Sequence, residues 1–235
     1  MKKELSNINN LLIQYFGLPV RKKENPDPLD ILIGTILSQN TNDKNSFKAY
    51  NNLKSKIKSW EELISIRTFN LEKIIKVAGL GKQKARTIKS FLKNLQKKRD
   101  SISIDYIKKM NDEMAIEELT RFKGIGVKTA SCVLLFSFGR NVCPVDTHIQ
   151  RILNRLGLVK TKTLDKTYKA IVNFIPENSG YTLHTNLLRL GREICLPSNP
   201  KCSICPLEKL CEYEHKIFFD KFPKTENKFF LLDEI

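Results

Sequence analysis

The sequence lacks any long apolar stretch. No run of hydrophobic residues reaches the roughly 18 that a membrane-spanning helix needs. The N-terminal stretch MKKELSNINNLLIQYF also makes a poor signal peptide, because Asn and Gln interrupt its apolar residues. We therefore expect a cytoplasmic protein that has no targeting segment and no membrane partner.

Acidic residues are scarce relative to basic ones. The 235 residues include 41 Lys and Arg but only 25 Asp and Glu, which gives a formal net charge of +16. Such an excess indicates a polyanionic partner, either nucleic acid or an anionic membrane surface. The lack of apolar segments favours nucleic acid. The length allows one large domain or two small ones, each with a hydrophobic core.

Strand patterns are nearly absent as well. Apolar residues recur at helical spacing along almost the whole chain, so the sequence predicts an all-α protein. Only SISIDYI (101–107) alternates, and we expect an extended connector there. Ser59 and Glu62 have the spacing of a capping box, and Asn111 is placed to cap a helix running to Arg121.

The stretch FKGIGVKTA (122–130) interrupts the helical pattern. Gly124 and Gly126 permit positive φ and close backbone approach between two helices. Amide groups at the start of the second helix would then point outward and attract phosphate. Lys123 adds a cation beside them. The motif predicts a sequence-independent grip on a nucleic-acid backbone, with a plain turn between helices as the alternative.

Two residues near this motif have the chemistry of a reactive site. Lys128 falls in the first turn of the following helix, where the helix dipole disfavours an ammonium. A neutral amine is a nucleophile that can form a Schiff base, whereas a solvated lysine or a phosphate contact is the plainer interpretation. Asp146 precedes an amphipathic helix, so spacing alone favours an N-cap. Near Lys128, its carboxylate could instead accept a proton or stabilise positive charge developing on a sugar.

The cysteines are unevenly distributed. Four of the six form a Cys-x6-Cys-x2-Cys-x5-Cys pattern: Cys195, Cys202, Cys205 and Cys211. Clustered cysteines in a cytosolic chain are more often metal ligands than disulfides. Four thiolates can bind zinc or an iron–sulfur cluster, and the spacing leaves that choice open. We expect Cys132 and Cys143 to be small buried residues.

The glycine hairpin, the VDTHIQR stretch and the cysteine pattern occur in this order, and together they resemble the endonuclease III branch of the helix–hairpin–helix DNA glycosylases over residues 26–213. The resemblance implies an all-α, two-domain fold. A six-helix barrel would span 25–139, and a discontinuous [4Fe-4S] cluster domain would combine 1–24 with 140–235. A monomer would bind double-stranded DNA that contains a damaged base or an abasic site, and a flipped nucleotide would enter the cleft between the domains.

The resemblance also implies roles for individual residues. Lys128 would be the Schiff-base nucleophile at the deoxyribose C1′, and Asp146 would activate it and support departure of the base. Gly124 and Gly126, with Lys123, would form the DNA-binding hairpin. The four cysteines of the pattern would ligate the cluster.

Two further segments match DNA-contacting parts of that family. Leu80, in GLGKQKA (79–85), would be a wedge into the base stack, the alternative being a hydrophobic cap contact. Gln39 and Asn40, in ILSQNTND (36–43), would contact the flipped base and fill its gap, the alternative being helix-end capping.

The chain also departs from the family pattern. Phe122-Lys123 replaces the usual Leu-Pro before the first hairpin glycine, and Ser38-Gln39-Asn40 replaces Ser-Ala-Gln. The second change leaves the preferred base open. Lys128 favours a bifunctional enzyme. The first hypothesis is therefore a bifunctional glycosylase and abasic-site lyase acting on oxidised pyrimidines. The alternatives are a glycosylase for mispaired thymine or uracil, adenine or 8-oxoguanine, and a non-catalytic DNA-binding module with a structural metal.

Overall fold

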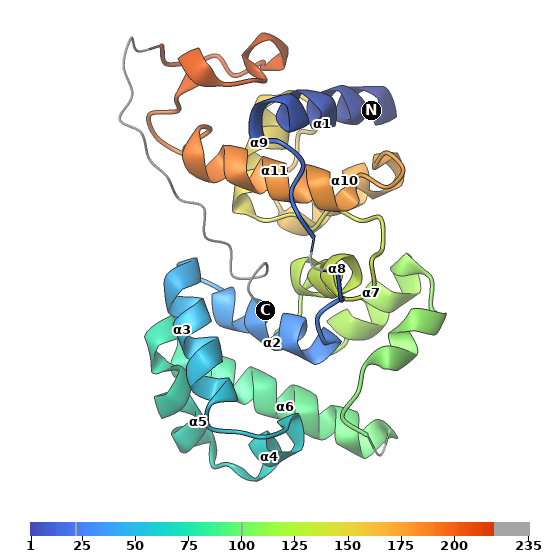
Figure 1. Cartoon of the computed structure of the whole chain (residues 1–235), viewed down its shortest axis with the longest axis vertical. Helices are drawn as coiled ribbons and strands as arrows, with labels where there is room; N and C mark the ends of the chain where they lie inside the picture. Colours follow the sequence, from blue (N-terminus) through green and yellow to red (C-terminus); the bar gives the residue numbers. More distant parts are fainter. Residues whose placement is uncertain (22, 100, 219–235) are drawn as a thin grey trace. The chain divides into compact units, whose positions relative to one another are not determined.

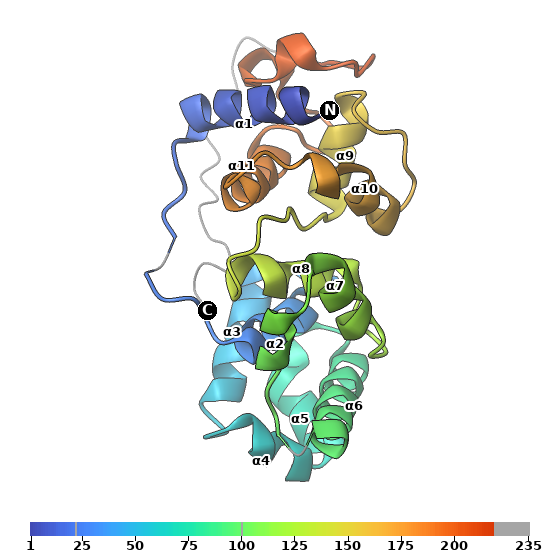
Figure 2. The ribbon, with the colours of Figure 1, turned by 90° about the vertical axis from the view of Figure 1, so that its right-hand side faces the viewer.

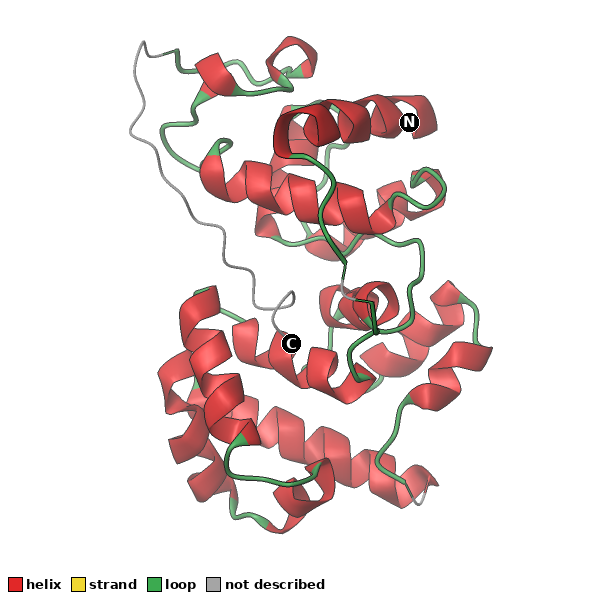
Figure 3. Ribbon diagram, viewed as in Figure 1, coloured by secondary structure: helices red, strands yellow, loops and turns green. Residues whose placement is uncertain are grey.

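The structure, a computed structural model, describes residues 1–21, 23–99 and 101–218. Within these ranges all regular structure is helical (Figure 3), as the sequence predicts. The same ranges contain no helix of the length and apolar character needed to traverse a bilayer. They form two compact units, one made of residues 23–139 and the other of residues 1–21 together with 140–218. The part of the predicted cluster domain from 219 to 235 lies outside the described residues, and the assignment of that domain to a cluster stays a prediction.

The unit of residues 23–139 is built from α-helices and two short 3₁₀ helices (Figure 1). These are α2 (Pro28–Ser38), α3 (Asp43–Lys54), α4 (Trp60–Ser65), α5 (Thr68–Ile75), η1 (Lys76–Ala78), α6 (Gly81–Arg99), η2 (Asp105–Lys109), α7 (Asp112–Thr120) and α8 (Val127–Phe136).

Helix α2 is the central helix of this unit. Its start is fixed by Asp27, whose carboxylate accepts hydrogen bonds from the backbone N–H of Leu29 at 2.8 Å and of Asp30 at 3.2 Å. Pro28 occupies the first helical position, where its missing N–H costs nothing. Seven consecutive residues, 31–37, are buried, because α3, α6 and α8 all pack against this helix. The core therefore holds α2 in place along most of its length.

Helix α6 has one apolar stripe. The predicted positions Ala85, Ile88, Leu92 and Leu95 are all buried. Helix α6 packs against α5 and α4, and the three helices lie in the same region of both ribbon views (Figures 1 and 2). The opposite face is charged, so the helix is amphipathic in the ordinary sense of a surface helix.

The second unit joins the N-terminal helix to the C-terminal half of the chain. It contains α1 (Lys2–Phe16), α9 (Thr147–Arg155), α10 (Leu164–Ile171), η3 (Val172–Phe174), α11 (Gly180–Glu193), η4 (Cys202–Ile204) and η5 (Glu208–Leu210). Helix α1 packs on α11 through Leu5, Ile8 and Leu12, which are buried. Two side chains of α11 secure the end of α1. Asn186 donates to the Gly17 carbonyl at 3.1 Å and Arg189 to the Phe16 carbonyl at 3.1 Å.

Two local predictions have different outcomes. Asn111 caps α7 as predicted, since its side chain accepts a hydrogen bond from the Met114 N–H at 2.9 Å. The capping box at Ser59 is wrong. Ser59 is the N-cap residue of α4, but it makes no side-chain cap bond, and Glu62 accepts instead from the Lys58 N–H at 3.0 Å.

The predicted extended connector at 101–107 is also wrong in its second half, where η2 begins at Asp105. The Ser103 hydroxyl accepts from the Asp105 N–H at 3.0 Å and donates to the Asp105 carboxylate at 2.8 Å. Such local side-chain bonds favour a turn over an extended strand. Periodicity of two could not reveal them.

The buried stripe of α6 predicts the effect of one substitution. We expect Leu92→Ala to lower the free energy of unfolding by about 2–5 kcal/mol, because it leaves a cavity in the core. Lys93→Ala, at the next position and exposed, should change it by less than about 0.5 kcal/mol. Urea unfolding followed by circular dichroism measures both. Equal losses in the two variants would contradict this account of the helix.

Candidate nucleic-acid interface and cysteine cavity

The hairpin between α7 and α8 uses its two glycines for different reasons. Gly124 has φ of +89°, and a Cβ atom there would lie 2.7 Å from side-chain atoms of Thr87 on α6. Gly126 has φ of −97° and is the N-cap residue of α8. A Cβ atom at Gly126 would have nothing within 4 Å. Gly124 is therefore required by the fold, whereas the space beside Gly126 is open to a ligand.

The two Gly-x-Gly motifs differ in their central residue. Ile125, in the hairpin, is 4% exposed and anchors the turn in the core. Leu80, in the turn before α6, is 49% exposed and has φ of +48°. The alternative interpretation of Leu80 as a hydrophobic cap contact is hard to reconcile with this exposure. The first motif presents an apolar side chain to solvent, and the second buries one.

Gln39 lies next to the hairpin. It is the C-cap residue of α2, and its side-chain amide donates to the Gly124 carbonyl at 3.4 Å. Asn40 follows in an exposed turn with φ of +50°. The end of α2 and the hairpin are thus joined by one side chain, although 85 residues separate them in sequence. Sequence spacing gave no sign of this contact.

The two hairpin lysines have different surroundings. Lys123 is exposed, and Lys128 is half-buried in the first turn of α8. The Ser131 hydroxyl donates to the Lys128 carbonyl at 3.1 Å, which reinforces that turn. These lysines, Gln39, Asn40 and Leu80 all belong to the unit of residues 23–139.

Asp146 is the N-cap residue of α9, as its spacing indicates. Its Oδ1 accepts from the Ile149 N–H at 2.9 Å, and the side chain is half-buried. The cap holds the carboxylate in a fixed orientation at the start of the helix. Asp146 belongs to the other unit, so its predicted partnership with Lys128 stays a prediction.

The burial of one charged residue in this region was not predicted from the sequence. Lys84, in the first turn of α6, is only 2% exposed. Its ammonium donates to the carbonyls of Leu37 and Ala78, both at 2.8 Å. Burial lowers the pKa of Lys84 to about 8. A lysine three residues past a Gly-x-Gly turn gives no sequence signal of burial, because lysine is usually exposed.

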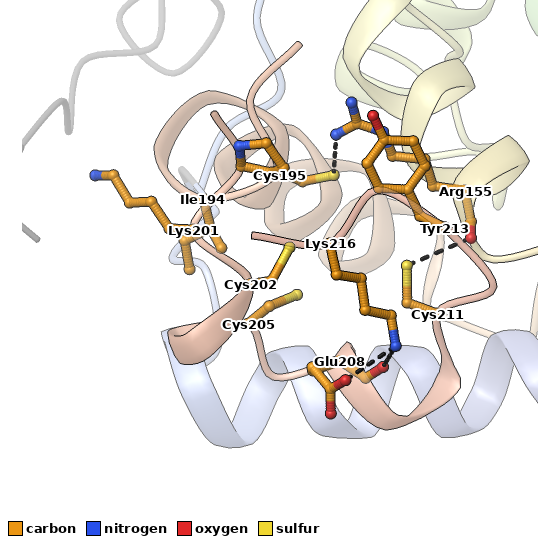
Figure 4. Close-up of a pocket in the computed structure, with 11 residues that line it drawn as sticks. Arg155, Ile194, Cys195, Lys201, Cys202, Cys205, Glu208, Cys211, Tyr213 and Lys216 are labelled. Atoms are coloured by element: carbon orange, nitrogen blue, oxygen red, sulfur yellow. Dashed lines mark hydrogen bonds and ion pairs between the residues drawn. The ribbon is translucent and has the colours of Figure 1, made fainter. Parts of the chain in front are cut away.

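The four cysteines of the predicted ligand set line one cavity in the second unit (Figure 4). The cavity has an empty volume of about 320 Å³, including space open to solvent, and Ile194, Pro200 and Tyr213 also line it. In the described part of the chain, no three His, Cys, Asp or Glu side chains are drawn together closely enough to hold a metal ion. The thiols surround the cavity without converging on one point. Their number and chemistry fit a zinc ion or an iron–sulfur cluster.

Burial and neighbouring groups modulate these thiols. Burial raises the pKa of the Cys205 thiol to about 12 and also raises the pKa of Cys211. A metal must therefore displace protons from both thiols when it binds. As predicted, Cys132 and Cys143 are buried elsewhere in the chain.

Two arginines of α9 connect Asp146's helix to the cysteine loop. Arg151 donates to the carbonyls of Cys195 and Gly191 at 2.7 and 2.8 Å. Arg155 donates to the Cys195 Sγ at 3.3 Å (Figure 4) and to the Leu196 carbonyl at 2.7 Å. Neither arginine was predicted from the sequence, although both follow Asp146 in the same helix. Hydrogen bonds to a carbonyl 40 or more residues away leave no pattern in the sequence.

Comparison with known proteins agrees with these features. Residues 33–177 match the family described as HhH-GPD superfamily base excision DNA repair protein. The endonuclease III of Thermotoga maritima is 36% identical over 193 residues, which cover 82% of this chain and 86% of that protein. The chain belongs to the endonuclease III family. It is accordingly an endonuclease III-like base excision repair DNA glycosylase.

Solved structures give the same picture of the fold of this endonuclease III relative. A trapped endonuclease III–DNA covalent intermediate has a TM-score of 0.76 at 25% identity and covers 90% of this chain and 95% of its own. A thermostable thymine-DNA glycosylase has a TM-score of 0.74 at 22% identity, and the match covers 90% of this chain and 96% of that one. The second likeness concerns the fold alone. The helix–hairpin–helix fold predicted from the sequence is confirmed.

The two hairpin glycines should respond differently to alanine. We expect Gly124→Ala to lower the free energy of unfolding by more than about 1 kcal/mol, because its positive φ strains an L-residue and its Cβ would meet Thr87. Gly126→Ala should cost less, about 0.5 kcal/mol, because its only penalty is that alanine is a poorer N-cap residue than glycine. Urea unfolding of both variants tests this difference. If Gly126→Ala is the more damaging change, the geometry described for the hairpin is incorrect.

Proposed function

We propose that this chain is a bifunctional DNA glycosylase and abasic-site lyase that acts on oxidised pyrimidines in double-stranded DNA. The observation that carries the proposal is the position of Lys128, in the first turn of α8 and directly after a hairpin with open space at Gly126. A phosphate bound at the N-terminus of α8 would hold the sugar–phosphate backbone beside the amine. The trapped covalent intermediate of the endonuclease III relative supports a covalent step.

The chain's own residues account for the binding step. The net charge of +16 gives a salt-dependent attraction to DNA that does not depend on sequence. The α8 amides and Lys123 bind the backbone, which positions the duplex without reading bases. A damaged base unstacks at lower cost than an intact one, so it is the base extruded most often. Leu80 enters the stack, and Gln39 and Asn40 contact the flipped base and fill its gap.

Lys128 and Asp146 then carry the chemistry. The Lys128 amine attacks the sugar C1′, forming a C–N bond as the glycosidic bond breaks and the base leaves with the bonding electrons. Asp146 accepts the proton lost by the amine and stabilises the positive charge on the sugar. The nitrogen lone pair then forms the second C–N bond of a protonated imine as the C1′–O4′ bond breaks and O4′ takes up a proton. The imine acidifies the 2′ hydrogen, and loss of that proton expels the 3′ phosphate by β-elimination.

Cys195, Cys202, Cys205 and Cys211 would hold a [4Fe-4S] cluster. When bound, it supplies four metal–sulfur bonds that fix the loop structurally. Arg155 orients the loop by its bonds to Cys195 and Leu196, and so keeps it against α9.

A second substrate class is favoured by one observation. The stretch Ser38-Gln39-Asn40 replaces the family's usual Ser-Ala-Gln. The Gln39 side-chain amide is also fixed by its hydrogen bond to the Gly124 carbonyl of the hairpin. An amide at this point could accept a different base, such as mispaired thymine or uracil, adenine or 8-oxoguanine. A cleavage panel that pairs each lesion with each opposite base separates these substrates.

Borohydride trapping tests the lyase. We expect wild-type protein to form a covalent complex with an abasic duplex after reduction, and Lys128→Ala to form none. Lys123→Ala is the matched control from the same hairpin. It should keep trapping at saturating protein and lower the slope of log affinity against log salt by about 1, as loss of one phosphate contact does. A wild-type protein that binds the duplex but yields no trapped complex contradicts the lyase proposal.

Metal analysis tests the cofactor. Protein purified without oxygen should be brown and contain iron and acid-labile sulfide in equal amounts. Cys205→Ser should lose both, because one thiolate ligand is gone, whereas Cys132→Ala should retain them. A colourless wild-type protein containing zinc would refute the cluster assignment.

A further inference from the structure

Lys84 places a positive charge inside the unit of residues 23–139. At 2% exposure it is among the largest fully buried side chains of the described chain. Burying an ammonium is costly unless polar partners replace its water. The Leu37 and Ala78 carbonyls do so, each at 2.8 Å. The cost of this arrangement calls for an explanation beyond the filling of space, which an apolar side chain would do better.

Both carbonyls belong to helix ends. Leu37 lies in the last turn of α2, and Ala78 is the last residue of η1. Carbonyls at helix C-termini lack intrahelical partners and carry partial negative charge. One ammonium therefore satisfies two helix ends that approach each other from different parts of the sequence. Helices α2 and α6 pack together in this unit, with Lys84 at the start of α6.

Each of these helix ends leads into a turn with unusual backbone. Asn40 follows Leu37 by three residues and has φ of +50°, and Leu80 follows Ala78 by two residues and has φ of +48°. Among the described residues, only Asn178 and Asn199 besides these two have positive φ without being glycine. A leucine in this region is strained, and such strain persists only where surrounding contacts hold it.

Lys84 is bound to the second turn twice. Its backbone N–H donates to the Leu80 carbonyl at 3.0 Å, while its side chain holds the Ala78 carbonyl. The first turn is held by the same ammonium at Leu37, and by Gln39 through the Gly124 carbonyl. The two turns that carry Asn40 and Leu80 are thus fixed to one buried atom.

We propose that Lys84 is a positioning residue that sets the spacing between the Asn40 and Leu80 turns, and that the enzyme depends on this spacing to extrude a nucleotide from duplex DNA. The inference rests on the proposed function. Extrusion needs two groups to enter the base stack at a defined separation, one into the gap and one as a wedge. Lys84 touches neither DNA nor the reacting atoms. Backbone binding at the α8 hairpin does not depend on it.

The chain offers a matched control on the same helix. Lys89 is also buried, burial also lowers its pKa, and its ammonium donates to a single backbone carbonyl, that of Ile66. Ile66 is the C-cap residue of α4 and lies in neither turn. Lys84→Met and Lys89→Met therefore each remove a buried ammonium that donates to backbone carbonyls, two in the first case and one in the second, and only the first releases the two turns.

Hydrogen exchange tests the positioning role without DNA. We expect Lys84→Met to accelerate amide exchange in both turns, at residues 39–41 and 79–81, and Lys89→Met to leave both at the wild-type rate. Unchanged exchange in Lys84→Met, or acceleration in one turn alone, overturns the proposal. This readout is independent of whether the protein is a lyase.

DNA binding tests the consequence for extrusion. The measured quantity is the ratio of affinity for a duplex with a stable abasic-site analogue to affinity for the undamaged duplex. Lys84→Met should lower this ratio by at least about fivefold, as loss of coupling between two sites does, while affinity for the undamaged duplex stays within about twofold of wild type. Lys89→Met should keep the wild-type ratio. Equal ratios in the two variants mean that Lys84 is only structural.

Further variants keep the proposal testable if Lys84→Met does not fold. Lys84→Gln retains one donor group and should give an intermediate ratio and intermediate exchange. In the wild-type background, Asn40→Ala and Leu80→Ala should have non-additive effects on the affinity ratio, because both turns share one anchor. Additive effects overturn the proposal. If wild-type protein binds the abasic-site duplex and the undamaged duplex equally well, while Lys84→Met still accelerates exchange in both turns, the proposed function is contradicted. The role of Lys84 in holding the two turns is then still supported.

Discussion

The rest of this structure depends on the contact between the hairpin and α6. Gly124 can approach Thr87 only because it has no Cβ, and Ile125 is buried beside it. This contact fixes the direction in which α8 begins, and hence the direction of its unpaired N–H groups. The start of α8 in turn sets the position of Lys128, which lies in the first turn of that helix. A looser turn would leave the amides and the amine without a defined relation to a bound phosphate.

The same unit concentrates its polar interactions at helix ends. Gln39 ties the end of α2 to the hairpin, and Lys84 ties it to the end of η1. The exposed residues Asn40 and Leu80 therefore lie on turns that are fixed by hydrogen bonds of Gln39 and Lys84. In the other unit, α9 has a comparable position, since Asp146 caps its start and Arg155 binds the cysteine loop near its end. In each unit, a residue at a helix end makes a hydrogen bond that stabilises the fold and is also proposed to act on DNA, Gln39 in one unit and Asp146 in the other.

Much of the fold could be predicted from the sequence because its signals are local. Helical periodicity identified the buried stripe of α6, and residue type with spacing identified the caps at Asn111 and Asp146. The cysteine pattern identified the four residues that line one cavity. The errors at Ser59 and at 101–107 arose from local side-chain hydrogen bonds, that of Glu62 with the Lys58 N–H and those of Ser103 with Asp105. Periodicity cannot reveal such bonds.

What the sequence could not provide was the set of long-range polar contacts. Lys84 resembles any other lysine at the start of a basic helix, and only the meeting of α2, η1 and α6 makes it a buried anchor. The most direct test of the central claim is to identify the lysine that joins DNA. After borohydride reduction with an abasic duplex, proteolysis and mass spectrometry should locate the sugar adduct on Lys128. An adduct on another lysine, Lys123 for example, would contradict the account.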